Sequence, residues 1–213
     1  METTLKALYL ATAAAVAFAS PALAQVSPNY VQLNVGSGVA GTADIGASVD
    51  DLGSASYDLD LDPGFFISAA AGAAMPTGFA LEGEVVYFTN DGDTQEIEDL
   101  TGESVDASAE TLGLLVNANY RFATSGTIQP YVGAGVGYGK VEYDVDELGG
   151  SDDDNGFMWQ LKAGVTFAMA NSTTWDIGYR YVRSPEYEVS DDFSSLSVET
   201  DTHIVSAGIR HSF

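Results

Sequence analysis

The stretch Thr202–Phe213 closes the chain and reads THIVSAGIRHSF. Successive side chains of a strand point to opposite faces. One face of this stretch is mostly apolar and ends on Phe213, whereas the other is small or polar and includes Arg210, with Ile204 as its apolar exception. Such a strand needs a cover for its apolar face, and lipid can provide one if similar strands precede it.

Seven earlier stretches repeat this alternation of apolar and polar residues. They are Val31–Val39, Tyr57–Gly72, Phe79–Phe88, Thr111–Phe122, Ile128–Val141, Phe157–Ala168 and Trp175–Arg183. The segments between them alternate in length, with long acidic segments at about 41–56, 90–110, 142–155 and 184–201 and short turns at 73–78, 123–127 and 170–174. A transmembrane barrel has this layout, with short periplasmic turns, long extracellular loops and both termini in the periplasm. The sequence therefore predicts an all-β fold: an eight-stranded antiparallel up-and-down transmembrane β-barrel.

The first 24 residues have the features of a secretory signal peptide. Lys6 precedes an apolar run at Ala7–Ala19, and Ala22 and Ala24 supply the small residues before a cleavage site. The run is shorter than the ~20 residues of a membrane-spanning helix. We expect cleavage after Ala24, which leaves residues 25–213 as the barrel domain; an uncleaved N-terminal anchor is the alternative.

The charge balance is strongly acidic, with 31 Asp and Glu against 7 Lys and Arg. This composition argues against a nucleic-acid partner, because nucleic-acid binding depends on basic side chains. Of the 30 acidic residues that follow position 24, 27 lie in the long segments and their flanks, counted as 41–62, 90–110, 142–155 and 184–201. The chain has no cysteine, which excludes disulfides and thiolate metal sites.

The remaining acidic residues, Glu82, Glu84 and Asp176, lie on faces predicted to point inward. The inward faces also hold four basic residues: Arg121, Lys162, Arg180 and Arg210. An eight-stranded barrel has room inside only for side chains, so we expect these charges to form an interior network. Strand directions suggest three pairings: Glu82 with Arg121, Asp176 with Arg210, and Glu84 with Lys162 or Arg180.

Glycines alternate along several inward faces, for example Gly133, Gly135, Gly164 and Gly208. They either make space for the long charged side chains or relieve the curvature of the strands. The two interpretations are compatible, and the sequence leaves both open.

Three segments resemble a known group: NANYRF at Asn117–Phe122, QPYVGAGVG at Gln129–Gly137 and GIRHSF at Gly208–Phe213. Together with the strand pattern, residues 25–213 resemble the small OmpA-like and opacity-type outer-membrane β-barrels, particularly the porin-like surface antigens of alphaproteobacteria. The resemblance implies insertion by the barrel-assembly machinery, which recognises a final aromatic residue, here Phe213. His211 departs from the family, which more often has an aromatic residue there.

No catalytic, cofactor or metal site is expected from the sequence. His211 and Ser212 are adjacent, so a strand points them to opposite faces and they cannot share a reaction. His203 falls near a rim, where we expect an interface residue. The acidic runs at 90–93 and 152–155 offer oxygen ligands suited to calcium, but neither fits the calcium-loop pattern.

The hypothesis that follows is a non-enzymatic integral protein of a Gram-negative outer membrane, with a structural or surface role such as adhesin or surface antigen. Its expected partners are outer-membrane lipids, lipopolysaccharide and the assembly machinery, and we expect a monomer. A narrow porin-like channel is one alternative. A soluble lipocalin-like barrel is another, and it requires the apolar faces inward and the four basic residues outward.

Overall fold

The computed structural model describes residues 29–49, 53–62, 64–92, 107–145, 150–169, 172–191 and 194–213. The expected signal peptide, with Ala22 and Ala24, lies outside the described residues. No helix in these ranges is long and apolar enough to cross a membrane.

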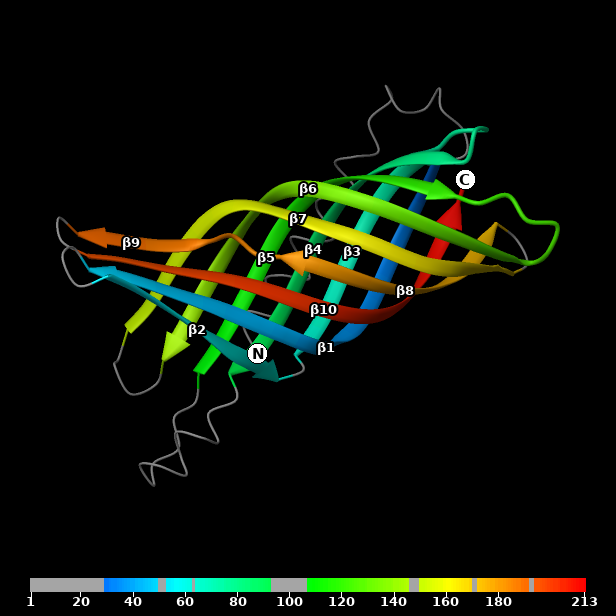
Figure 1. Cartoon of the computed structure of the whole chain (residues 1–213). Helices are drawn as coiled ribbons and strands as arrows, with labels where there is room; N and C mark the ends of the chain where they lie inside the picture. The colour runs from blue at the N-terminus through cyan, green and yellow to red at the C-terminus, as the bar shows by residue number, and fades with distance from the viewer. Residues whose placement is uncertain are drawn as a thin grey trace.

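Ten strands form one antiparallel sheet that closes on itself (Figure 1). They are β1 (Asn29–Val49), β2 (Gly53–Asp62), β3 (Phe65–Ala74), β4 (Phe79–Gly92), β5 (Ala107–Arg121), β6 (Ile128–Val145), β7 (Gly150–Ala168), β8 (Thr173–Arg183), β9 (Tyr187–Asp191) and β10 (Ser194–Ser212). The first strand β1 pairs with the last strand β10, from Tyr30 opposite Ser212 to Val49 opposite Ser194. This pairing removes the free edges that an open sheet would leave on the barrel wall.

The ten strands fill eight strand positions around the barrel, because two of these positions are each occupied by two consecutive strands. Strands β2 and β3 both pair with β1 and β4, and β2 ends at Asp62 before β3 begins at Phe65. Strands β8 and β9 both pair with β10, with a break at 184–186. The predicted eight-stranded antiparallel up-and-down barrel is therefore confirmed.

The strands continue further than predicted into the long acidic segments. β1 runs to Val49 where a loop was expected from about residue 41, and β6 and β7 stay paired to Val145 opposite Gly150. Beyond a membrane both faces of a hairpin are in water, so the apolar alternation is lost while pairing still satisfies the backbone groups. We call this side of the barrel the long-hairpin end. The opposite side, with the short connections from β3 to β4, from β5 to β6 and from β7 to β8, is the short-turn end.

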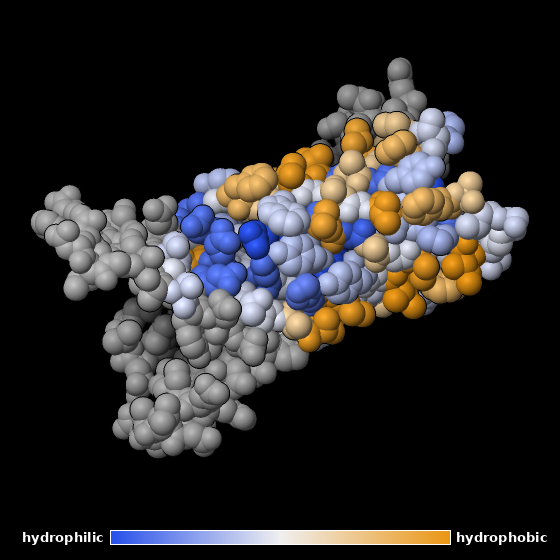
Figure 2. Space-filling view, in the orientation of Figure 1, coloured by the Kyte–Doolittle hydropathy of each residue, from blue (hydrophilic) through white to orange (hydrophobic). Residues whose placement is uncertain are grey.

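The outer face of the barrel is apolar. The residues predicted to point outward are largely exposed, among them Leu33, Val116, Val136, Leu161, Ile177 and Ile209. Figure 2 shows apolar side chains over the barrel wall and hydrophilic ones gathered toward the long-hairpin end. Lys162, Arg180 and Arg210 are buried inside. This arrangement is the reverse of what the soluble lipocalin-like alternative requires.

Candidate functional site in the barrel interior

The centre of the interior is organised around the Glu84 carboxylate, whose side chain is fully buried. Arg180 Nη1 lies 2.6 Å from Glu84 Oε1, and Lys162 Nζ lies 3.4 Å from Oε2. The amides of Asn117 and Gln160 each donate to Oε2 at 2.8 Å. The expected pairing of Glu84 with Lys162 or Arg180 is confirmed, and both cations take part.

Glu82 extends this network toward the short-turn end. Lys162 Nζ lies 2.7 Å from Glu82 Oε1, so one ammonium bridges both glutamates. The Tyr30 hydroxyl donates to Glu82 Oε2 at 2.9 Å. The predicted pairing of Glu82 with Arg121 is wrong. That prediction considered only neighbouring strands, whereas the lumen is narrow enough for Lys162 of β7 to cross to β4.

Asp176 also has a different partner from the one predicted. The Tyr131 hydroxyl donates to Asp176 Oδ1 at 3.1 Å, whereas Arg210 Nε donates to Gln32 Oε1 at 2.7 Å. The Arg210 guanidinium also stacks over the Tyr30 ring at 4.1 Å. Neutral polar side chains thus take the place of the predicted ion pair. Gln32 lies directly opposite Arg210 on the neighbouring strand β1, and Tyr131 reaches Asp176 of β8 from β6.

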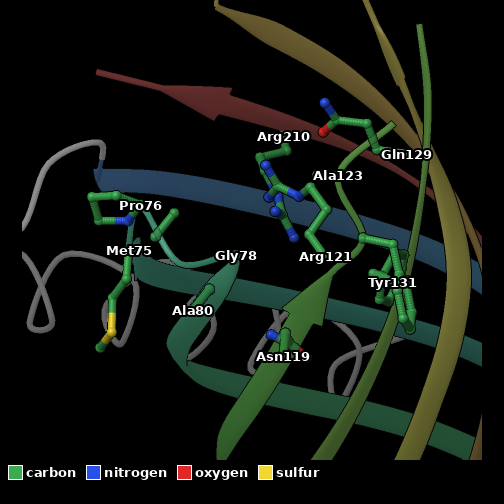
Figure 3. Close-up of a pocket in the computed structure, with 12 residues that line it drawn as sticks. Met75, Pro76, Gly78, Ala80, Asn119, Arg121, Ala123, Gln129, Tyr131 and Arg210 are labelled. Atoms are coloured by element: carbon green, nitrogen blue, oxygen red, sulfur yellow. The ribbon is translucent and has the colours of Figure 1, made fainter. Parts of the chain in front are cut away.

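Arg121 lies with Arg210 at the mouth of the barrel on the short-turn end (Figure 3). Among the described residues Arg121 forms no ion pair within 4.0 Å. It interacts with Arg210, Asp176 and Glu82 only at longer electrostatic range. All seven residues of the predicted network therefore lie in the half of the interior nearest the short-turn end, and Arg121 is the member without an ion-pair partner among the described residues.

An apolar cluster fills the interior beside the charge network, on its long-hairpin side. This apolar plug consists of Phe66, Val86, Phe88, Leu115, Met158, Val182 and Ile204, each at most 1% exposed. The Arg180 guanidinium lies 4.8 Å from the centre of the Phe66 ring, which joins the network to the plug. Sequence analysis missed the plug, although isolated apolar residues on inward faces, such as Ile204, were its signal.

The inward glycines make space, but mostly for neutral side chains. A Cβ at Gly164 would lie 2.8 Å from the Tyr131 hydroxyl, and one at Gly133 would lie 2.1 Å from Asn119 Oδ1. Gly135 and Gly208 leave room for Asn117 and Asn34 in the same way. The space-making interpretation is therefore supported, with asparagine and tyrosine in place of the expected charged chains.

The two histidines lie on the outer wall and contact neither the charge network nor each other. His203 hydrogen-bonds the Tyr179 hydroxyl through Nδ1 and packs against the rings of Tyr179 and Tyr181. His211 Nδ1 lies 3.2 Å from Thr173 Oγ1. Among the described residues no group of three or more His, Cys, Asp and Glu is placed to hold a metal ion.

A closed eight-stranded barrel with an apolar wall and a side-chain-filled interior is the architecture of small outer-membrane barrels. The family model of the outer membrane protein beta-barrel domain matches residues 10–210. The chain belongs to this family and is an integral outer-membrane β-barrel protein. The matched range begins before the cleavage site expected after Ala24. A search of curated proteins finds no match to the chain.

Solved outer-membrane barrels share the fold. OprG from Pseudomonas aeruginosa has a TM-score of 0.57 at 13% identity, over 87% of this chain and 96% of that chain. Neisserial surface protein A has a TM-score of 0.49 at 24% identity, over 87% and 97% of the two chains. Ail of Yersinia pestis has a TM-score of 0.43 at 16% identity, over 85% and 98%. These similarities concern the fold alone. The comparison with OprG, which has a TM-score of 0.57, is the one of the three that supports the shared fold.

Proposed function

We propose that the protein is a non-catalytic, non-conducting surface barrel that displays acidic hairpins to the outside of the cell. The observation that carries this proposal is the sealed interior. Two successive layers of side chains fill the lumen. One is the network of paired polar groups around Glu84, and the other is the apolar plug on its long-hairpin side. An ion would have to displace both layers, and eight strands leave no further lumen.

Single-channel recording in a planar bilayer tests the closed interior. We expect no steady openings from the folded protein, because a passing ion would lose its hydration inside the apolar plug without gaining ligands. The control is the same protein unfolded by heat before addition, which reports leakage from the detergent or from defects. Steady openings specific to the folded protein would contradict the proposal and favour a narrow porin-like channel.

The proposed orientation places the acidic hairpins outside the cell and both termini in the periplasm. The chain has no cysteine, so single cysteines can report sidedness. Asn155, at the long-hairpin end, and Ser125, in a short turn, are both exposed. A membrane-impermeant maleimide should label Asn155→Cys on intact cells, and Ser125→Cys only after the outer membrane is permeabilised. The opposite labelling pattern would reverse the orientation.

The proposed partners are the lipids that cover the apolar wall, lipopolysaccharide in the outer leaflet and the barrel-assembly machinery. Phe213 is 65% exposed on the strand that closes the barrel, and its N–H donates to the Asn29 carbonyl at 2.9 Å. An exposed terminal aromatic residue is accessible for recognition by the assembly machinery. The role is tested by the folded fraction of a Phe213→Ser variant in cells, which should be lower than that of the unchanged protein. The closed β1–β10 seam is consistent with a monomer, and the segments NANYRF and GIRHSF suggest the porin-like surface antigens as the subgroup.

The acidic hairpins supply the surface role in this proposal. In the described ranges, Glu142 lies beside Lys140 at 3.5 Å, and Asp201 and Glu199 both contact Arg183. With few basic residues to balance the acids, the outer surface is anionic and repels other anionic surfaces. Divalent cations could then link this surface to lipopolysaccharide. A Ca²⁺ titration of the folded barrel tests this point, and a non-saturable response would reject specific binding.

A further inference from the structure

A cavity of about 210 Å³ opens at the short-turn end of the barrel. It lies between the short turns and the charge network, and Figure 3 shows the side chains that surround it. The polar side chains of its lining are Asn119, Arg121, Gln129, Tyr131 and Arg210. No carboxylate is among the residues that line it, although the chain as a whole is strongly acidic.

The charges around the cavity do not balance. In the described interior on the short-turn side of the plug there are four basic residues against three acidic ones. Lys162 and Arg180 are matched by Glu82 and Glu84, and Asp176 offsets one of the two remaining charges, those of Arg121 and Arg210. Arg210 also reaches Glu82, but only at 3.9 Å. Arg121 has no ion-pair partner among the described residues and interacts with the like charge of Arg210. The surplus positive charge therefore lies at the cavity.

The second observation is the side chain of Asn119. It is 6% exposed, and neither its amide nitrogen nor its amide oxygen has a hydrogen-bond partner among the described residues. Gly133 leaves the space that Asn119 occupies, so the local backbone is shaped to hold this amide in the lining. A buried amide without partners is costly, and such a group in a native protein calls for a ligand or water to satisfy it.

We propose that this cavity binds one small oxyanion, a carboxylate or a phosphate monoester, between Arg121 and Arg210 with the Asn119 amide as a further donor. A guanidinium presents paired N–H donors that match the oxygens of both groups. One bound anion would also cancel the surplus charge of the interior. The site is independent of the proposed surface role, because it lies at the opposite end of the barrel.

The binding test uses the folded barrel in uncharged detergent micelles and follows the Asn119 side-chain amide by ¹H–¹⁵N NMR. Inorganic phosphate and acetate are titrated separately, with sodium chloride at matched ionic strength as the control. We expect a saturable shift with at least one oxyanion and none with chloride. Saturation with acetate alone identifies a carboxylate site, and saturation with phosphate alone a phosphate site. If neither phosphate nor acetate produced a saturable shift of the amide signal, the proposal would be overturned.

Two variants separate binding from folding. Arg121→Gln should weaken the binding of the oxyanion about tenfold or more, because it removes one charged fork. Arg183→Gln is its matched control, because Arg183 lies on the outer wall and pairs with Asp201 at 2.7 Å. An unchanged affinity in Arg121→Gln would contradict the site.

Asn119→Asp keeps the shape of the side chain and supplies the missing negative charge within the protein. We expect this variant to raise the midpoint of thermal unfolding on heat-modifiable gels. It should also abolish the shift that phosphate and acetate cause in the Arg210 Nε–H signal, which replaces the Asn119 amide as the reporter in this variant. It is informative even if Arg121→Gln folds poorly. A lowered midpoint, or an unchanged anion-dependent shift of the Arg210 signal, would contradict the proposed site.

Discussion

Glu84→Gln is expected to lower the free energy of unfolding by about 3–5 kcal/mol, because it leaves buried cations without their partner. The substitution keeps the shape of the side chain and removes its charge. Among the described residues Arg180 then has only neutral acceptors, such as the Gln160 side-chain oxygen at 3.3 Å, and Lys162 keeps Glu82 as its carboxylate partner. The interior, which already has a surplus of positive charge, gains another uncompensated one. Urea unfolding in lipid vesicles, followed by the fluorescence of Trp159 and Trp175, measures the loss.

Glu142→Gln is the matched control for this prediction. Glu142 pairs with Lys140 at 3.5 Å, but both side chains are about two-fifths exposed on the outer wall. An exposed pair of this kind contributes about 0–1 kcal/mol. If Glu84→Gln were no more harmful than Glu142→Gln, the interior network would not stabilise the barrel.

A double variant separates the lost interaction from the unpaired charge. Adding Arg180→Met to Glu84→Gln removes the buried cation as well, and apolar replacements of buried pairs are often tolerated. We therefore expect the double variant to recover part of the stability lost by the single one. A further loss of stability would indicate that Arg180 contributes mainly through its contacts with Gln160 and Phe66.

The wall of the barrel could be predicted from the sequence because lipid imposes a strict rule on it. Every second residue of a spanning strand must be apolar, so Val116 and Ile209 reveal their direction in the sequence itself. The same rule assigned Glu84 and Lys162 to the interior. It does not apply beyond the membrane, which explains why the extension of β1 to Val49 was missed.

The pairings inside the barrel could not be predicted in the same way. The position of a residue along its strand determines where its side chain lies along the barrel axis. It does not determine which side chain it contacts across the lumen. Lys162 takes Glu82 from the opposite wall, and Tyr131 reaches Asp176 over Gly164 and Gly178. The partners depend on which glycines leave space, and this is a property of the closed barrel rather than of any one strand.

The second large effect on stability is expected from a charge placed on the lipid-facing side of the barrel. Ala134 lies exposed on the outer face of β6, between Ala118 of β5 and Leu161 of β7. An arginine at mid-depth must either enter hydrocarbon or pull water and headgroups toward it, at a cost of about 2–4 kcal/mol. Ala134→Arg should therefore lower the free energy of unfolding in lipid vesicles by this amount. Ala134→Leu, which adds size without charge, should be nearly neutral.

Depth is what separates a lipid effect from a packing effect in this experiment. Ile128 lies on the same face at the first residue of β6 and is 48% exposed. Near the interface an arginine costs only about 0–1 kcal/mol, because its long side chain reaches water. Ile128→Arg should thus be much milder than Ala134→Arg, although it removes a larger apolar side chain. In detergent micelles the difference between Ala134→Arg and Ile128→Arg should be smaller, because micelles adapt their thickness to the charge. Equal losses at both positions in lipid vesicles would mean that the outer face of β6 does not contact a hydrocarbon layer.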